Sequence, residues 1–259
     1  AGISKQTKAE QYPQEETVAG LTYELDEEDT GYLVTKWDGV SEEVTIPDEL
    51  HGIPVRAVGS SVFQGRKLLR KITFGKNISS IYWKSFYGCS SLVEVHFGSN
   101  IREVEEDAFR ECSNLQIITG GNRLKKIGTH AFADCQSLKE FHVPKNITYF
   151  GNGVFVGCTN LEKITASATP KNMIEISMDS FEGSKWYQQC ITQKKTVIWN
   201  HVLIYAGGLH GNVTLSGKKY KGIALFAFKN CQDIKTITVK NIKYIHRVAF
   251  FYCSASQLE

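Results

Sequence analysis

Phenylalanine recurs along this chain at a fixed interval, and that interval constrains the fold more than any other feature of the sequence. Five phenylalanines, here called markers, follow one another at successive gaps of 23 residues: Phe63, Phe86, Phe109, Phe132 and Phe155. Three further markers continue the series at gaps of 26, 47 and 22 residues: Phe181, Phe228 and Phe250. A fixed period of about 20 to 50 residues is typical of repeat proteins, in which each repeat stacks on its neighbours. We therefore predict a solenoid of stacked coils.

Other positions recur at the same interval and predict what each coil contains. An apolar residue stands five positions before each marker: Val58, Ile81, Val104, Ile127, Phe150, Ile176, Ile223 and Ile245. A cysteine stands three positions after six of the markers: Cys89, Cys112, Cys135, Cys158, Cys231 and Cys253. Apolar and polar residues alternate at 92–97, which predicts a short strand in each coil. Strands stacked at roughly 4.8 Å would form a parallel sheet along one long core.

The chain before the first marker is predicted to cover the open end of the solenoid. Residues 1–18 are polar and poor in branched side chains, so we interpret them as a disordered lead or a cloning edge. Leu21–Leu25 and Tyr32–Trp37 alternate around an acidic turn, which predicts a β-hairpin, and 44–46 predict a third strand. An uncovered terminal coil would expose core and strand edges, so we assign 19–50 as an N-terminal β cap.

The repeats are predicted over 51–184 and again over 223–259, where the last coil is incomplete. Because that coil ends before its later apolar positions are filled, we expect the native protein to continue or to cover this end with another chain. The 47-residue gap corresponds to about two repeats with one marker absent. Within it, alternation on both sides of Asn200 and His201 predicts a hairpin. We interpret 185–222 as a β-hairpin insertion or degenerate repeat in a continuous solenoid.

Charge and hydropathy argue against two classes of partner. The net charge is only +3, and the basic residues are scattered singly or in pairs. Nucleic acids and anionic membranes select clustered lysine and arginine, so we expect no nucleic-acid partner. No apolar run approaches the roughly 18 to 20 residues of a membrane helix, so we expect no membrane span.

The cysteines and histidines do not predict a chemical site. One repeat position explains six of the seven cysteines, and no C-x-x-C pair exists, so we predict buried free thiols rather than zinc ligands or disulfides. Cys190 stands outside this pattern and is the candidate for a reactive thiol. No nucleophile elbow or fixed-offset partner is present. We therefore expect no catalytic site, no metal and no cofactor.

The repeat also resembles a known family. Residues 127–144 read I-G-T-H-A-F-A-D-C-Q-S-L-K-E-F-H-V-P. This unit is similar to the leucine-rich repeat of the BspA-like family, roughly I-G-x-x-A-F-x-x-C-x-x-L-x-x-I-x-I-P, and the likeness extends over about 44–253. The resemblance implies a leucine-rich-repeat solenoid, mainly β with irregular turns. It also implies a surface or secreted bacterial protein whose relatives bind host matrix proteins or other cells.

Two groups of residues are candidates for binding. The first points outward from the predicted sheet: Glu94, His96, Glu140 and His142. The two histidines lie two coils apart, roughly 10 Å at strand spacing, which is too far for shared metal ligation. The second group is an aromatic island in the insertion: Trp186, Tyr187, Trp199 and Tyr205. Tryptophan and tyrosine are the aromatic residues most often found at binding hot spots.

Three functions remain open from the sequence. The first is a non-catalytic module for adhesion that binds a host matrix or cell-surface protein through the solenoid face and the aromatic island. The second is a carbohydrate-binding module at the island, which would require a pocket with stacked tryptophans and converging polar groups. The third is a structural spacer of a larger surface protein.

Overall fold

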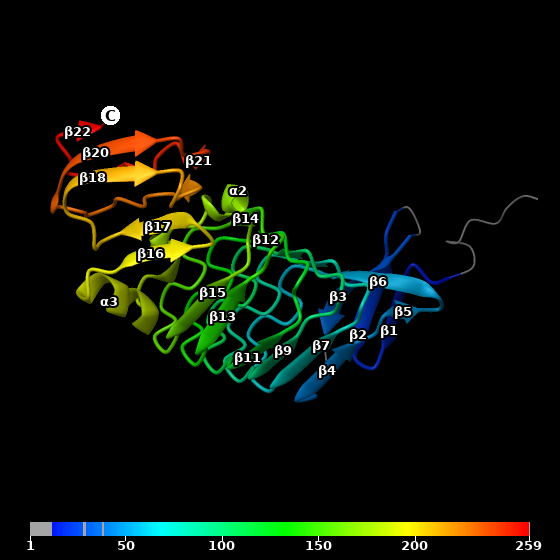
Figure 1. The fold of residues 1–259 in the computed structure, drawn as a ribbon. Helices are drawn as coiled ribbons and strands as arrows, with labels where there is room; N and C mark the ends of the chain where they lie inside the picture. Colours follow the sequence, from blue (N-terminus) through cyan, green and yellow to red (C-terminus); the bar gives the residue numbers. More distant parts are fainter. Residues whose placement is uncertain (1–11, 28–29, 38, 259) are drawn as a thin grey trace, which may run out of the picture.

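The chain folds into a mainly β solenoid, as the 23-residue period predicts. The computed structural model describes residues 12–27, 30–37 and 39–258. Figure 1 shows the coils stacked into an arc. The N-terminal strands lie at one end of the arc, and β20 (Ile234–Lys240) and β22 (Gln257–Leu258) lie at the other.

Each repeat contributes one longer strand to one side of the solenoid. The six strands on this side follow one another along the lower edge in Figure 1: β4 (Glu43–Ile46), β7 (Lys71–Phe74), β9 (Glu94–His96), β11 (Ile117–Thr119), β13 (Glu140–Val143) and β15 (Lys163–Ala166). The first four form one parallel sheet, and the last two form another. In five of them, buried residues alternate with exposed or half-buried ones, and in β11 the inward residue, Ile118, is half-buried. This is the period-2 alternation expected of strands with one face on the core.

The returning segments of the coils form a second parallel stack. Its members are β6 (Ile53–Val58), β8 (Ser80–Ile81), β10 (Glu103–Val104), β12 (Lys126–Ile127) and β14 (Tyr149–Phe150). The N-terminal cap joins this stack because β3 (Tyr32–Trp37) pairs in parallel with β6. A short strand, β5 (Glu49–Leu50), pairs with the other end of β6.

The cap contains the predicted hairpin and one strand more. β2 (Leu21–Leu25) and β3 are antiparallel, as predicted. The strand predicted at 44–46 lies within β4 and belongs to the solenoid sheet, because it pairs in parallel with β7. The interpretation of 1–18 as a disordered lead is wrong for β1 (Glu15–Val18), which pairs with β2. Its polar composition fits an edge strand that faces solvent. Residues 1–11 lie outside the described part of the chain.

The first six marker phenylalanines form a continuous buried column in the core. The first six are fully buried, and neighbouring rings are 4.7 to 5.7 Å apart, centroid to centroid, with planes within 8° of parallel. The main chain has the same repeat, since Phe109 donates its N–H to the Ala131 carbonyl at 2.8 Å and Phe132 donates to the Val154 carbonyl at 3.0 Å. Trp37 covers the first ring of the column, Phe63, at 5.2 Å.

The repeating cysteines pack beside this column as free thiols, as predicted. Each of four thiols lies within hydrogen-bond distance of a marker carbonyl in the preceding coil and donates to it. The Cys112 thiol, for example, donates to Phe86 at 3.2 Å. Cys190 is also buried, and burial raises the pKa of its thiol. A raised pKa opposes formation of the thiolate, which argues against a reactive thiol at Cys190.

The buried thiols make stability fall at alkaline pH. Burial raises the pKa of Cys89, Cys158 and Cys231 from 9.0 to about 12. An unfolded chain releases these protons near pH 9, whereas the folded chain retains them. The stabilisation is therefore complete below pH 9 and is lost as the pH rises toward 12. Burial raises the pKa of Tyr23 and Tyr205 to about 12 as well, which steepens the loss above pH 10.

Chemical denaturation at a series of pH values tests this prediction. We expect the free energy of unfolding to decline steadily from pH 9 to pH 11, and Cys89→Ala to decline less steeply than the unchanged protein. A constant free energy of unfolding across that range would contradict the prediction.

The insertion contains one helix as well as the predicted hairpin. Two short helices, α2 (Pro170–Met173) and the 3-10 helix η1 (Met178–Phe181), precede the insertion. The insertion itself begins with helix α3 (Lys185–Thr192). The hairpin of β16 (Thr196–Trp199) and β17 (Val202–Ala206) follows. Asn200 and His201 form its two-residue turn with φ of 45° and 63°, the backbone that such hairpin turns require.

The remaining strands continue the solenoid after the hairpin. They are β18 (Gly211–Ser216), β19 (Gly222–Ile223), β20, β21 (Tyr244–Ile245) and β22. Ala206 takes the place of the absent marker, because its N–H donates to the Ala227 carbonyl at 2.8 Å as a marker would. The insertion therefore contains a degenerate coil whose marker position is alanine.

Candidate functional site

The exposed side of the longer strands is an extended surface of the solenoid, and we call it the strand face. It consists of two residues from each of five strands, all exposed or half-buried: Lys71, Thr73, Glu94, His96, Ile117, Thr119, Glu140, His142, Lys163 and Thr165. The alternation in each strand places Glu94, His96, Glu140 and His142 on this face, as expected. The sequence-predicted residues of the first group therefore share one surface.

Charged and polar groups on the strand face are paired, either between neighbouring coils or within one strand. Glu140 accepts a hydrogen bond from Lys163 at 2.9 Å, which lowers the pKa of its carboxyl group. Glu94 lies 2.9 Å from His96, and this contact is the main cause of its lowered pKa. His142 Nδ1 lies 2.8 Å from the Thr165 hydroxyl. The strand face is thus polar and close to electrically neutral.

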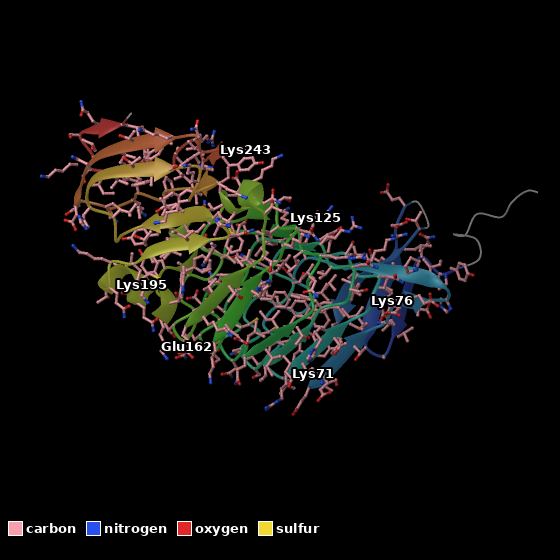
Figure 2. All side chains as sticks on the ribbon, viewed as in Figure 1. Lys71, Lys76, Lys125, Glu162, Lys195 and Lys243 are labelled. Atoms are coloured by element: carbon pink, nitrogen blue, oxygen red, sulfur yellow. The ribbon has the colours of Figure 1, made fainter. Side chains whose placement is uncertain are left out.

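Positive charge elsewhere on the molecule is dispersed. Figure 2 shows Lys76, Lys125, Lys195 and Lys243 at separate places along the arc. These lysines do not gather into one basic patch of the kind that nucleic-acid-binding proteins carry.

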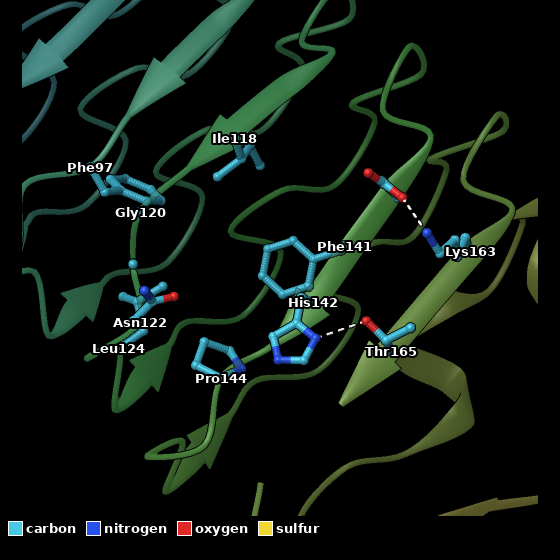
Figure 3. Close-up of a pocket in the computed structure, with 12 residues that line it drawn as sticks. Phe97, Ile118, Gly120, Asn122, Leu124, Phe141, His142, Pro144, Lys163 and Thr165 are labelled. Atoms are coloured by element: carbon cyan, nitrogen blue, oxygen red, sulfur yellow. Dashed lines mark hydrogen bonds and ion pairs between the residues drawn. The ribbon is translucent and has the colours of Figure 1, made fainter. Parts of the chain in front are cut away.

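The strand face is interrupted between β11 and β13. In the described part of the chain no strand pairing joins the two, and a pocket of about 290 Å³ opens there. We call it the sheet-break pocket. Figure 3 shows Phe97 and Leu124 on one side of it and Phe141, His142 and Pro144 on the other.

The two tryptophans of the aromatic island pack against the core. Trp186 and Trp199 stack on each other at 5.3 Å, and both meet the ring of Phe181 edge-on, at 5.1 and 5.9 Å. They cover the last ring of the phenylalanine column, as Trp37 covers the first. Both are half-buried. Their rings are therefore engaged within the fold rather than held open for a ligand.

The two tyrosines of the island line a second pocket of about 260 Å³, the insertion pocket. Tyr205 is buried, whereas Tyr187 is half-buried. Lys229 contacts Asp179 at 2.7 Å, and Lys194 contacts Asp233 at the same distance. Sequence analysis missed these four charged residues, because they come from separate segments with no common spacing.

The described residues contain no group of three or more His, Cys, Asp or Glu side chains placed to hold a metal ion. In the same part of the chain, no helix is both long and apolar enough to cross a membrane.

The ion pairs of the insertion pocket are mutually satisfied, and the Asp179 carboxylate raises the pKa of Lys229 and keeps it charged.

The stacked coils, the phenylalanine column and the parallel sheets define a leucine-rich repeat solenoid. Two solved bacterial leucine-rich repeat proteins have this fold. The T. pallidum protein is 20% identical, with a TM-score of 0.56, and the match covers 89% of this chain and 86% of that one. The Bacteroides ovatus protein is 20% identical, with a TM-score of 0.58, and the match covers 94% of this chain and 70% of that one.

The family follows from the repeat itself. The family model for the BspA type leucine-rich repeat region matches residues 56–188 and 137–257, in six copies. The chain belongs to the BspA type leucine-rich repeat family, in agreement with the resemblance of residues 127–144. None of the curated proteins matches the chain.

Proposed function

We propose that this chain is a non-catalytic bacterial surface or secreted module that binds a protein of a host matrix or of another cell. The observation that carries the proposal is the strand face, an exposed polar surface that extends across five coils. Solenoid proteins bind partners through extended faces of this kind. Its opposite charges are paired, as in Glu140 with Lys163, which favours a protein partner over a polyanion.

Family membership supports the other parts of the proposal. Repeat proteins bind through surfaces assembled from many coils, which supports a non-catalytic role. The surface or secreted location rests on the resemblance to the BspA-like family.

Binding of the purified protein to a panel of matrix proteins, cell-surface proteins and glycans, at low and high salt, tests this function. We expect a protein ligand whose affinity falls at least fivefold when Glu94, His96, Glu140 and His142 are all replaced by alanine, since truncation of a binding hot spot costs about 1 kcal/mol or more. Lys125→Ala together with Lys243→Ala, two exposed residues away from the strand face, is the matched control. A protein ligand that binds both variants equally well would move the site away from the strand face.

A second candidate function is carbohydrate binding at the insertion pocket. It is favoured by the charged groups that surround Tyr187 there, Asp179 and Lys229 among them. The glycan arm of the same panel tests it, with Lys229→Ala expected to abolish glycan binding. Because Trp199 packs on Phe181, Trp199→Ala would disturb the fold and is unsuited to this test. If the folded protein binds no member of the panel, that result would favour a structural spacer.

A further inference from the structure

One apolar side chain is missing from the core at the sheet-break pocket. One repeat position, at or just after the end of the longer strand, holds Phe74, Phe97 and Val143 in three of the coils. All three residues are buried. The corresponding residue between β11 and β12 is Gly120, whose φ of +80° is a left-handed backbone that favours glycine. Gly120 adds no side chain to the core at this position, and a Cβ on its backbone would meet the main-chain carbonyl of Phe97 in the preceding coil. A pocket lies beside it. Phe97, Ile118, Leu124, Phe141 and Pro144 surround the pocket.

Main-chain hydrogen bonding is interrupted at the same place. The first residue of four of the strands donates its N–H to a carbonyl of the preceding coil at 3.1 to 3.2 Å: Lys71 to Glu42, Glu94 to Arg70, Ile117 to Val93 and Lys163 to Lys139. Within the described residues, Glu140 has no corresponding bond to the coil that contains β11. Glu140 N–H is therefore available on the edge of β13.

The opposite edge, on β11, is available for the same reason. Alternate residues of a parallel strand direct their N–H and C=O groups to opposite neighbours. Ile117 N–H and Thr119 C=O both bond to the coil of β9. The N–H and C=O of Ile118 must then face β13. Two strand edges with available donors and acceptors thus face each other across the pocket.

The coil that contains β11 and the coil that contains β13 remain joined away from the pocket. β10, β12 and β14 pair without interruption, and Phe109 and Glu111 donate to Ala131 and Ala133 at 2.8 and 2.9 Å. The opening is therefore a wedge on one side of an otherwise closed solenoid. It is a local feature of the two coils and not a boundary between two halves of the chain.

These groups define the chemistry of an occupant. Available main-chain donors and acceptors on strand edges are matched by the main chain of an extended peptide. The volume of 290 Å³ lies near the lower end of ligand sites, at about 300 Å³, so it fits one large side chain rather than an oligosaccharide. The polar side chains that line the pocket already have partners, which favours an uncharged apolar group in the occupant. Glu140 is paired with Lys163, and His142 lies within hydrogen-bond distance of Thr165 and Ser167. Ile117, 42% exposed at the edge, adds apolar surface.

We propose that the sheet-break pocket binds an extended segment of a partner protein, which bonds to the edges of β11 and β13 and places one large, uncharged apolar side chain in the pocket beside Gly120. The proposal rests on the protein-binding function proposed above and specifies the chemistry of the partner at one point of the strand face.

Selection from a display library of random linear peptides, followed by affinity measurement with the synthesised peptides, tests the proposal. We expect the selected peptides to share one large apolar residue. Asn122→Trp, an exposed position at the edge of the pocket, should reduce their affinity at least tenfold by covering the opening. Ser99→Trp, the same change at the same coil position where the sheet is closed, should change it less than twofold. N-methylation of the peptide bond beside the apolar residue should also reduce affinity at least tenfold.

Hydrogen exchange provides a measurement that needs no substitution. The amides of Ile118 and Glu140 should exchange quickly in the free protein and slow at least tenfold when a selected peptide is bound. Peptides that bind Asn122→Trp unchanged, or that leave these two amides unprotected, would overturn the proposal. If matrix or cell-surface proteins bind the strand face while no peptide is selected, the peptide site is rejected and the proposed function stands. If neither class binds, both are rejected.

Discussion

Phe109→Ala is expected to lower the free energy of unfolding by about 3 to 5 kcal/mol, the usual cost of truncating a buried aromatic residue. Phe109 is fully buried and lies between Phe86 at 4.9 Å and Phe132 at 5.3 Å, with the ring of Phe97 edge-on at 6.0 Å. Main-chain hydrogen bonds fix the spacing of the coils, so neighbouring rings cannot close the cavity. Urea denaturation followed by circular dichroism measures the change.

Phe251→Ala provides a matched control for this prediction. Phe251 belongs to the last coil and is 53% exposed, so its truncation should change the free energy of unfolding by less than about 0.5 kcal/mol. A loss below 1 kcal/mol for Phe109→Ala would mean that the coils repack around the gap, and the phenylalanine column would then not be the main source of stability.

The structure of the coils could be predicted because equivalent residues make the same contacts in every coil. Residues 23 positions apart occupy equivalent places, so one repeat position implies a stack such as Phe86 on Phe109. Alternation within each repeat predicted which residues face solvent, including His96 and His142. The hairpin at Asn200 and His201 was predictable for a local reason, since its turn and its alternation lie within ten residues.

The sheet break could not be predicted from the repeat. Gly120 is visible in the sequence as a departure at a position that holds Phe97 one coil earlier. The width of the opening, however, depends on how two neighbouring coils pack against each other, and Phe141, which stands at the position of Ile118 one coil later, lines the opening. A departure in one repeat indicates where to look, while the distance between coils is a tertiary property.

The structure of the insertion was only partly predictable because its aromatic residues are compatible with two roles, binding and packing. Tryptophan is typical both of binding hot spots and of buried aromatic clusters, so residue type could not show that Trp186 and Trp199 cover Phe181. Helix α3 had one usable signal, since the Ser184 hydroxyl accepts a hydrogen bond from the Tyr187 N–H at 3.0 Å and so caps the helix.

Gly128→Ala is expected to lower the free energy of unfolding by about 1 to 3 kcal/mol, the range observed for overpacked cores. Gly128 has an ordinary negative φ, so the reason for glycine is steric. A methyl group there would meet the main chain of the preceding coil, at the carbonyl carbon of Glu105 and the nitrogen of Glu106. Gly128 also donates its N–H to the Val104 carbonyl at 2.7 Å, which prevents the coils from moving apart without breaking a hydrogen bond.

Glu105→Ala is the matched control, because Glu105 occupies the same repeat position one coil earlier and already has a side chain there. Its half-buried carboxylate accepts one hydrogen bond, from the Trp83 N–H at 3.2 Å, so its truncation should cost less than about 1 kcal/mol. Denaturation of both variants in parallel measures the difference. Equal losses would contradict the steric reason. A larger loss for Gly128→Ala would establish that close approach of the two main chains, and not only the apolar column, fixes the spacing at which the coils stack.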